Sequence, residues 1–211
     1  LSTLPFHIQL FAALGFRLPK YLHIGPLQKM DGESKRKLSK RKDPEAALTY
    51  YRAVGYPVPS VYEYLLNVLN SNFEDWRRAN PDAPADSFPF SAKKMNPAGS
   101  LFDEAKLRDT SKNVISRMTA EQVLEETLSW ADENDAEFAA LLRSDPKTAV
   151  QALAIGRGGK KPRKDIAVWS EVKDYIGYLY DAAFRYADEL PEGTDKADAK
   201  KALTAFAAVY D

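Results

Sequence analysis

The sequence predicts a mainly α-helical fold, and three observations support this. Helix start signals recur along the chain, apolar residues repeat at three- and four-residue spacing, and only one short apolar run reads as extended. The chain has 211 residues, and 45% of them are hydrophobic, which is ordinary for a globular protein. We therefore expect successive helices around a common core, with a small β element near the N-terminus.

The first 42 residues are expected to form one helix, one strand and one basic loop. Residues 5–14 are apolar with helical spacing, and Gly15 can end that helix. Residues 21–24 form a short apolar run before Gly25-Pro26, which is typical of a buried strand. Residues 29–42 have no periodicity, so they are expected to be a loop.

The next helices are predicted from their capping residues. Asp43 followed by Pro44 starts a helix that Gly55 can close, and Ser60 with Glu63 resembles a capping box for the following helix. Proline and glycine are frequent over residues 80–100, which predicts a long irregular connection. The remaining helices are expected from Asp103 to about 112, from Thr119 with Gln122, from Asp145 to Gly156, after Asp165 as one long helix, and from about Asp195.

Composition excludes several chemistries. The chain has no Cys, so disulfides, thiolate metal sites and cysteine nucleophiles are ruled out. Its two histidines, His7 and His23, are too few for a His-based zinc site or a Ser–His triad, and we expect no protein-bound metal. No apolar run reaches the roughly 20 residues of a membrane span, and no signal peptide is visible. We therefore expect a cytoplasmic protein without a membrane partner.

Charge is balanced overall but separated along the chain. Seven basic and two acidic side chains give residues 29–42 a charge of +5, and one basic and eight acidic side chains give residues 119–145 a charge of −7. Residues 156–165, with five basic and one acidic side chain, return to +4. This separation indicates either a polyanionic partner that meets defined basic patches or solvated loops and helix faces.

The segment Lys37-Leu38-Ser39-Lys40-Arg41 resembles the KMSKS loop of class I aminoacyl-tRNA synthetases. The flanking segments 51–56, 64–70, 101–107 and 113–115 are similar to glutamate–tRNA ligases, and the resemblance covers roughly residues 1–185. It implies that residues 1–43 are a short β and loop remnant of the Rossmann catalytic domain. Residues 44–118 would then be a helical stem-contact region, and residues 119–211 a helical-bundle anticodon-binding domain. Because the chain begins at Leu1 rather than Met, we expect a fragment of a longer protein.

The resemblance also implies roles for the five loop residues. Lys40 matches the second lysine of the motif and would be the main stabiliser of the ATP phosphates, while Lys37 would assist. Leu38 would pack near the adenine, Ser39 would support the turn, and Arg41 completes the ATP-binding set. Flexible ammonium groups that close over the departing pyrophosphate stabilise the transition state more than the ground state. Lys42-Asp43-Pro44 stands where many family members have His-Gly.

Two sets of residues are candidates for tRNA contact. The resemblance suggests stem contact by Lys112, Asn113 and Arg117. The second set lies in the basic segment 156–165, between two predicted helices, and could pair with phosphates of the anticodon arm or remain solvated. Its members are Arg157, Lys160, Lys161, Arg163 and Lys164.

The family resemblance implies the following activity. The intact protein would attach L-glutamate to tRNA through a glutamyl-adenylate, with Mg-dependent use of ATP, and would act as a monomer; the fragment alone is expected to be inactive. A non-catalytic helical tRNA- or nucleic-acid-binding module and a helical scaffold with basic loops remain alternatives. Whether tRNA for glutamine is also charged is open.

Overall fold

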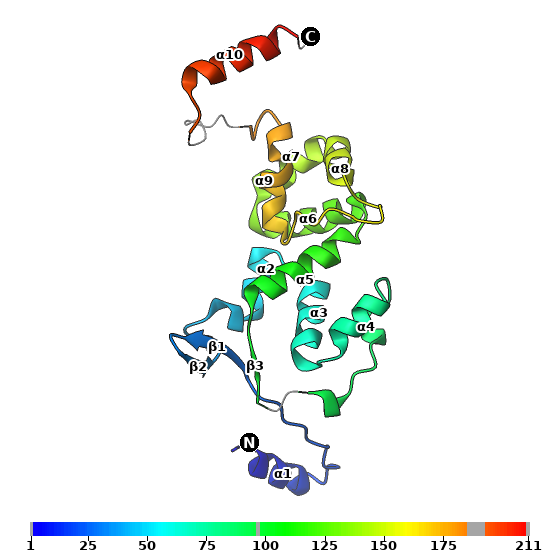
Figure 1. Ribbon diagram of the computed structural model, residues 1–211. Helices are drawn as coiled ribbons and strands as arrows, with labels where there is room; N and C mark the ends of the chain where they lie inside the picture. The colour runs from blue at the N-terminus through cyan, green and yellow to red at the C-terminus, as the bar shows by residue number, and fades with distance from the viewer. Residues whose placement is uncertain (1, 96–97, 185–192, 210–211) are drawn as a thin grey trace. The chain divides into compact units, whose positions relative to one another are not determined.

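The computed structural model describes residues 2–95, 98–184 and 193–209 (Figure 1). The chain divides into two compact units, Leu1–Ile176 and Gly177–Asp211. Within the described ranges, no helix is both long enough and apolar enough to cross a membrane. The predicted mainly α-helical class is confirmed, and the three-part division at residues 43 and 118 stays a prediction.

A small sheet forms near the N-terminus, after the predicted first helix, α1 (Leu4–Ala13). Its strand order is β2-β1-β3, with β1 (Leu27–Asp31) antiparallel to β2 (Ser34–Lys37) and parallel to β3 (Ser100–Leu101) (Figure 1). The strand predicted at residues 21–24 and the loop predicted for all of residues 29–42 were therefore wrong. The hairpin forms because Gly32, with φ +62°, allows a two-residue turn that pairs strands rich in charged residues.

The helix predicted from Asp43 is split into a 3-10 turn, η1 (Pro44–Ala46), and α2 (Leu48–Val54). The next helix, α3 (Val58–Leu69), begins before Ser60, because Pro57 and Pro59 fix its first turn. The predicted Ser60–Glu63 capping box is consequently wrong, because both residues lie past the start of the helix, and both are buried. A short helix that the sequence analysis missed, α4 (Phe73–Ala79), follows.

The connection over residues 80–100 is irregular, as predicted. It contains two 3-10 turns, η2 (Ala85–Ser87) and η3 (Ala92–Lys94), and residues 96–97 of it lie outside the described ranges. Phe88 packs from this connection against Phe73 and Leu66 in a small core of its own. The connection then returns through β3 to α5 (Glu104–Ser116), where Asp103 caps the helix by accepting from the Lys106 N–H at 3.0 Å.

Three helices follow, of which the first has the predicted capping box. The Thr119 hydroxyl and the Gln122 side chain each accept a backbone N–H at the start of α6 (Ala120–Asn134). The next two are α7 (Ala136–Ser144), which was not predicted, and α8 (Pro146–Ala154), which Asp145 caps as predicted.

The single long helix predicted after Asp165 is wrong. Residues 166–168 are buried, and a 3-10 turn, η4 (Trp169–Glu171), and a short helix, α9 (Val172–Ile176), follow them. The backbone there bonds to distant groups instead of forming a helix: the Ala167 carbonyl accepts from Ser111, and the Trp169 N–H donates to Gly55. In the second unit, η5 (Gly177–Leu179) precedes α10 (Lys196–Ala207), which begins at Asp195 as predicted.

The main core lies between α3 and α5, which pack side by side (Figure 1). Tyr56, Tyr64, Leu107 and Val168 are its buried members, and apolar side chains of α2 and α3 pack around them. Val168 comes from the extended segment after the basic loop, so this core joins residues that are more than 100 positions apart. Helices α6–α9 bury a further group of residues, which includes Val123, Phe138, Leu142, Leu153 and Ile176.

Candidate functional site

The KLSKR loop, residues 37–41, begins where strand β2 ends. The Leu38 N–H donates to the Leu27 carbonyl at 2.9 Å, which continues the hairpin pairing by one residue. The Ser39 carbonyl then accepts from the N–H groups of Lys42 and Asp43 at 2.9 and 2.8 Å and closes a tight turn. Leu38 and Ser39 are half-buried, whereas Lys37, Lys40 and Arg41 are exposed. The hairpin and this turn therefore bring the five predicted residues together and leave the cationic side chains in solvent.

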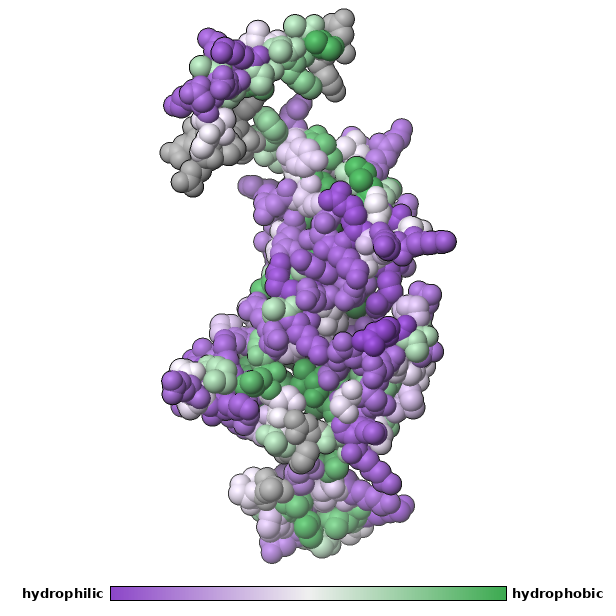
Figure 2. Space-filling model, in the orientation of Figure 1, coloured by the Kyte–Doolittle hydropathy of each residue, from purple (hydrophilic) through white to green (hydrophobic). Residues whose placement is uncertain are grey.

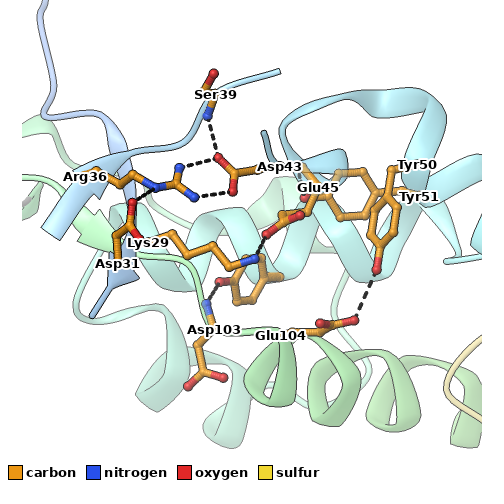
Figure 3. A network of polar contacts seen from close by, with 11 residues as sticks. Lys29, Asp31, Arg36, Ser39, Asp43, Glu45, Tyr50, Tyr51, Asp103 and Glu104 are labelled. Carbon is orange, nitrogen blue, oxygen red and sulfur yellow. Dashed lines mark hydrogen bonds and ion pairs between the residues drawn. The ribbon is translucent and has the colours of Figure 1, made fainter. Parts of the chain in front are cut away.

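One buried carboxylate holds this turn. The Asp43 carboxylate accepts hydrogen bonds from both terminal nitrogens of Arg36, at 2.6 and 2.7 Å, and from the Ser39 N–H at 2.9 Å (Figure 3). The guanidinium of Arg36 also donates to Asp31 at 2.8 Å. The Arg36 bonds hold the pKa of Asp43 well below its usual value, and the same bonds raise the pKa of Arg36. Asp43 stays ionised at neutral pH.

The sequence analysis missed this pair. The sequence predicts that Asp43 is a helix N-cap, because Asp-Pro-Glu is a common start signal, but its side chain turns to Arg36 and Ser39 instead. Arg36 is one of seven cations in the basic segment 29–42, and its sequence position alone does not distinguish it from the others. The detectable signal is an acidic residue close to a run of seven cations, since a carboxylate there has cationic partners within reach.

A second set of contacts fastens the residues after the loop. Lys29 of β1 pairs with Glu45 of η1, and the Tyr51 hydroxyl donates to the Glu45 carbonyl at 2.6 Å (Figure 3). The Tyr50 hydroxyl donates to Glu104 of α5 at 3.1 Å. Strand β1 is therefore joined to η1, η1 to α2, and α2 to α5, so the segment after the loop is held to the rest of the first unit.

A groove of about 1090 Å³ lies beside the loop. Lys37, Ser39 and Lys40 line part of it, and apolar side chains such as Tyr64 and Phe102 line much of the rest. Figure 2 shows a hydrophobic patch on the surface between the hairpin and α3, with polar side chains on both sides. The loop cations thus border apolar surface on one side and solvent on the other.

The predicted stem-contact residues lie at the end of α5. Lys112 and Asn113 are half-buried, and Arg117 donates to Glu63 at 2.8 Å. Glu63 is only 5% exposed and also accepts from Arg77 at 2.8 and 3.2 Å. Arg117 is therefore ion-paired within the chain, and its contact with tRNA stays a prediction.

The basic segment 156–165 is a loop between α8 and the buried residues 166–168, closed by the Arg163 N–H that donates to the Gly156 carbonyl at 2.9 Å. Lys160, Lys161 and Lys164 are exposed, and Arg163 pairs with Asp165 at 2.6 Å. This loop and the KLSKR loop lie on separate parts of the first unit (Figure 1). Both candidate surfaces are thus present, but they do not form one site.

Arg157 differs from the other four cations of the segment. Its guanidinium points inward and donates to the Leu153 carbonyl at 2.6 Å and to the Ile115 carbonyl at 2.7 Å. These bonds connect the ends of α8 and α5, and burial lowers the pKa of Arg157.

The described residues contain no group of three or more His, Cys, Asp or Glu side chains that could hold a metal ion.

No protein-family model matches the chain, but known proteins match it over its whole length. The chain is 46% identical over its full length to the glutamate–tRNA ligases of Acetivibrio thermocellus and of Clostridium perfringens, and it spans 39% of each. It is 44% identical to the glutamate–tRNA ligase of Sorangium cellulosum and spans 40% of it. The chain therefore covers about two fifths of the length of these curated relatives.

Solved structures share the fold. The chain superimposes on a glutamate tRNA ligase from Elizabethkingia meningosepticum with a TM-score of 0.52 and 18% identity, covering 99% of this chain and 40% of that one. For the glutamate-tRNA synthetase of Elizabethkingia anophelis the TM-score is 0.56 at 16% identity, covering 95% of this chain and 39% of that one.

Proposed function

The chain belongs to the glutamate–tRNA ligase family, in which it corresponds to the C-terminal part, and from this we propose that it forms part of an enzyme that joins L-glutamate to tRNA. In the proposed reaction, the glutamate carboxylate attacks the α-phosphorus of Mg-bound ATP, which gives glutamyl-adenylate and releases pyrophosphate. The terminal ribose of the tRNA then attacks the glutamyl carbonyl and releases AMP. This chain would supply the ATP loop and tRNA contacts, with the enzyme acting as a cytoplasmic monomer.

Of the structural observations, the exposed cations of the KLSKR loop are the one that carries this proposal. Lys37, Lys40 and Arg41 project from a turn whose backbone is fixed by strand β2 and by Asp43. Negative charge develops on pyrophosphate as it leaves, and ammonium groups placed beforehand lower the energy of that charge more than of the bound ATP. The compact charge and long stem of lysine suit such a contact.

The proposed tRNA contacts are of two kinds. Exposed cations of the segment 156–165 would pair with phosphates, and the end of α5 around Lys112, Asn113 and Arg117 would meet the stem. Arg157 contributes to this surface by fixing the ends of α5 and α8 rather than through free donors. Phosphate contacts of this kind give affinity and register without reading the base sequence.

The experiment uses the full-length protein with tRNA, ATP and labelled amino acid. We expect glutamate to be attached to tRNA only when ATP is present, and we expect glutamine to be left unattached. A protein that binds tRNA but attaches no glutamate under any of these conditions would instead be a non-catalytic binding module. Attachment of glutamine would extend the substrate range, and attachment without ATP would contradict the proposed adenylate.

A further inference from the structure

The Asp43 carboxylate fastens the KLSKR loop at three places. Asp43 is 2% exposed, and its two oxygens accept from Arg36 on the strand before the loop and from the backbone of Ser39 in the middle of the loop. Asp43 itself directly follows Lys42, the last residue of the basic segment. The start, the middle and the end of the turn therefore share one buried carboxylate (Figure 3).

This arrangement separates the cations of the segment into two kinds. Arg36 pairs with two carboxylates, the buried Asp43 and the exposed Asp31, so its charge is neutralised within the chain. Lys37 and Lys40 directly follow this fixed framework and are exposed. A reacting phosphate would therefore meet the lysines, while the arginine determines where the lysine backbones lie.

The distance dependence of catalysis makes this framework important for rate. A misplacement of about 1 Å in a group that stabilises the transition state can lower the rate about 100-fold. Charge stabilisation is efficient only when the donors are held in place before the charge develops. A turn fixed at three places satisfies that condition, whereas a free loop of glycine and lysine would have to be ordered in each catalytic cycle.

We propose that Arg36 and Asp43 are positioning residues for adenylate formation, and that this clamp sets the place at which Lys37 and Lys40 meet the ATP phosphates. The inference rests on the proposed function, because it assumes that the loop acts on ATP. Neither clamp residue touches the reacting atoms. Their effect on the reaction passes through the lysines, and above all through Lys40.

The test measures ATP–pyrophosphate exchange by the full-length ligase with tRNA present. Asp43→Asn keeps the shape of the side chain but removes its charge, and we expect kcat to fall about 10- to 100-fold while KM for ATP changes less than about threefold. Asp31→Asn is the matched control, since Asp31 pairs with the same guanidinium from its exposed side. We expect kcat of Asp31→Asn to stay within about twofold of wild type.

A double variant distinguishes positioning from a general structural role. If Asp43 acts through Lys40, then adding Asp43→Asn to Lys40→Ala lowers kcat by less than about threefold beyond Lys40→Ala alone. Full multiplication of the two effects would overturn the proposal, because Asp43 would then act independently of the loop lysine. Arg36→Gln provides a second route should Asp43→Asn fail to fold, since it breaks the clamp but leaves the Ser39 N–H bonded to Asp43.

The outcomes separate this inference from the proposed function. If Lys40→Ala leaves exchange unchanged, the loop does not act on ATP, and the ATP role of the loop fails together with the positioning role. The proposed ligase function fails only if the wild-type protein attaches no glutamate to tRNA. If Lys40→Ala abolishes exchange while Asp43→Asn and Arg36→Gln stay within about twofold of wild type, only the positioning role is overturned.

Discussion

The backbone N–H of Trp169 donates to the carbonyl of Gly55 at 2.8 Å, across 114 positions of sequence. Two neighbouring bonds strengthen this junction, because the Ser170 hydroxyl donates to the Val54 carbonyl at 2.8 Å and the Trp130 indole to the Ala53 carbonyl at 3.1 Å. The terminal carbonyls of α2 are thus satisfied by α6 and η4 rather than by water. The junction joins the predicted stem-contact helices to the helices that follow them.

Gly55→Ala should strongly destabilise the chain. Gly55 has φ +90°, and an added Cβ would lie 2.9 Å from Trp169 Cβ and 3.0 Å from its backbone nitrogen. Left-handed backbone costs an alanine about 1–2 kcal/mol, and overpacking adds about 1–3 kcal/mol. Urea denaturation of the wild type and of Gly55→Ala measures the difference in their free energy of unfolding.

Gly158→Ala is the matched control for that variant. Gly158 also has positive φ, +73°, but an added Cβ there meets nothing within 4 Å. It should cost only the backbone term, about 1–2 kcal/mol. Equal losses for the two variants would show that contact with Trp169 carries no part of the effect.

Asp135 should make stability depend on pH. It caps α7 by accepting from the Phe138 N–H at 3.0 Å and pairs with Lys173 at 2.6 Å, and the Lys173 bond holds the pKa of Asp135 below its usual 3.8. Because the folded-state pKa is the lower one, this stabilisation is present above about pH 4 and is lost as pH falls through the folded-state pKa.

Two substitutions separate the capping role of Asp135 from its charge. Asparagine caps nearly as well as aspartate, so Asp135→Asn should lose only the charged pair, about 0.5 kcal/mol at pH 7, and the loss should shrink as pH falls through the folded-state pKa of Asp135. Asp135→Ala should lose about 1 kcal/mol more at each pH, through the missing cap. Unfolding curves at pH 7 and at successively lower pH are the measurement, and a constant Asn effect would contradict this account.

Replacing Lys160, Lys161, Arg163 and Lys164 by Ala should weaken the salt dependence of tRNA binding. Each neutralised phosphate contributes about −0.7 to −0.9 to the slope of log affinity against log salt. If half of the four cations touch phosphate, the slope flattens by about 1.5. Titration of tRNA binding to the full-length ligase at several salt concentrations measures this, and an unchanged slope would mean that tRNA is held elsewhere.

Arg157→Ala should behave differently from that quadruple variant. Its guanidinium donates to the carbonyls of Leu153 and Ile115, so its removal leaves partly buried acceptors without these bonds. We expect a stability loss of about 1–3 kcal/mol with little change in the salt slope. A flattened slope without loss of stability would show that Arg157 contacts phosphate instead.

Local signals in the sequence were sufficient wherever the partners are close along the chain. The Thr119–Gln122 capping box and the caps at Asp103 and Asp145 were predicted correctly, because each bond spans three residues. These features depend on residue types at fixed short spacing.

Tertiary bonds explain where the sequence misled. The helix expected after Asp165 fails because Ala167 and Trp169 bond to Ser111 and Gly55, more than 50 positions away. Asp43 has the sequence of an N-cap, yet the bidentate pair with Arg36 competes successfully for its carboxylate. The distant backbone bonds and the Arg36–Asp43 pair both depend on tertiary contacts, which a short stretch of sequence does not reveal.

Lys40→Ala in the full-length ligase tests the central claim most directly, by ATP–pyrophosphate exchange with tRNA present. Lys35→Ala, which removes an exposed lysine from the paired strand β2, is the control. We expect Lys40→Ala to lower the exchange rate about 100-fold or more, because it removes a contact made mainly in the transition state, and Lys35→Ala to stay within about twofold of wild type. A loss of less than about threefold for Lys40→Ala would contradict the assignment of this loop to ATP.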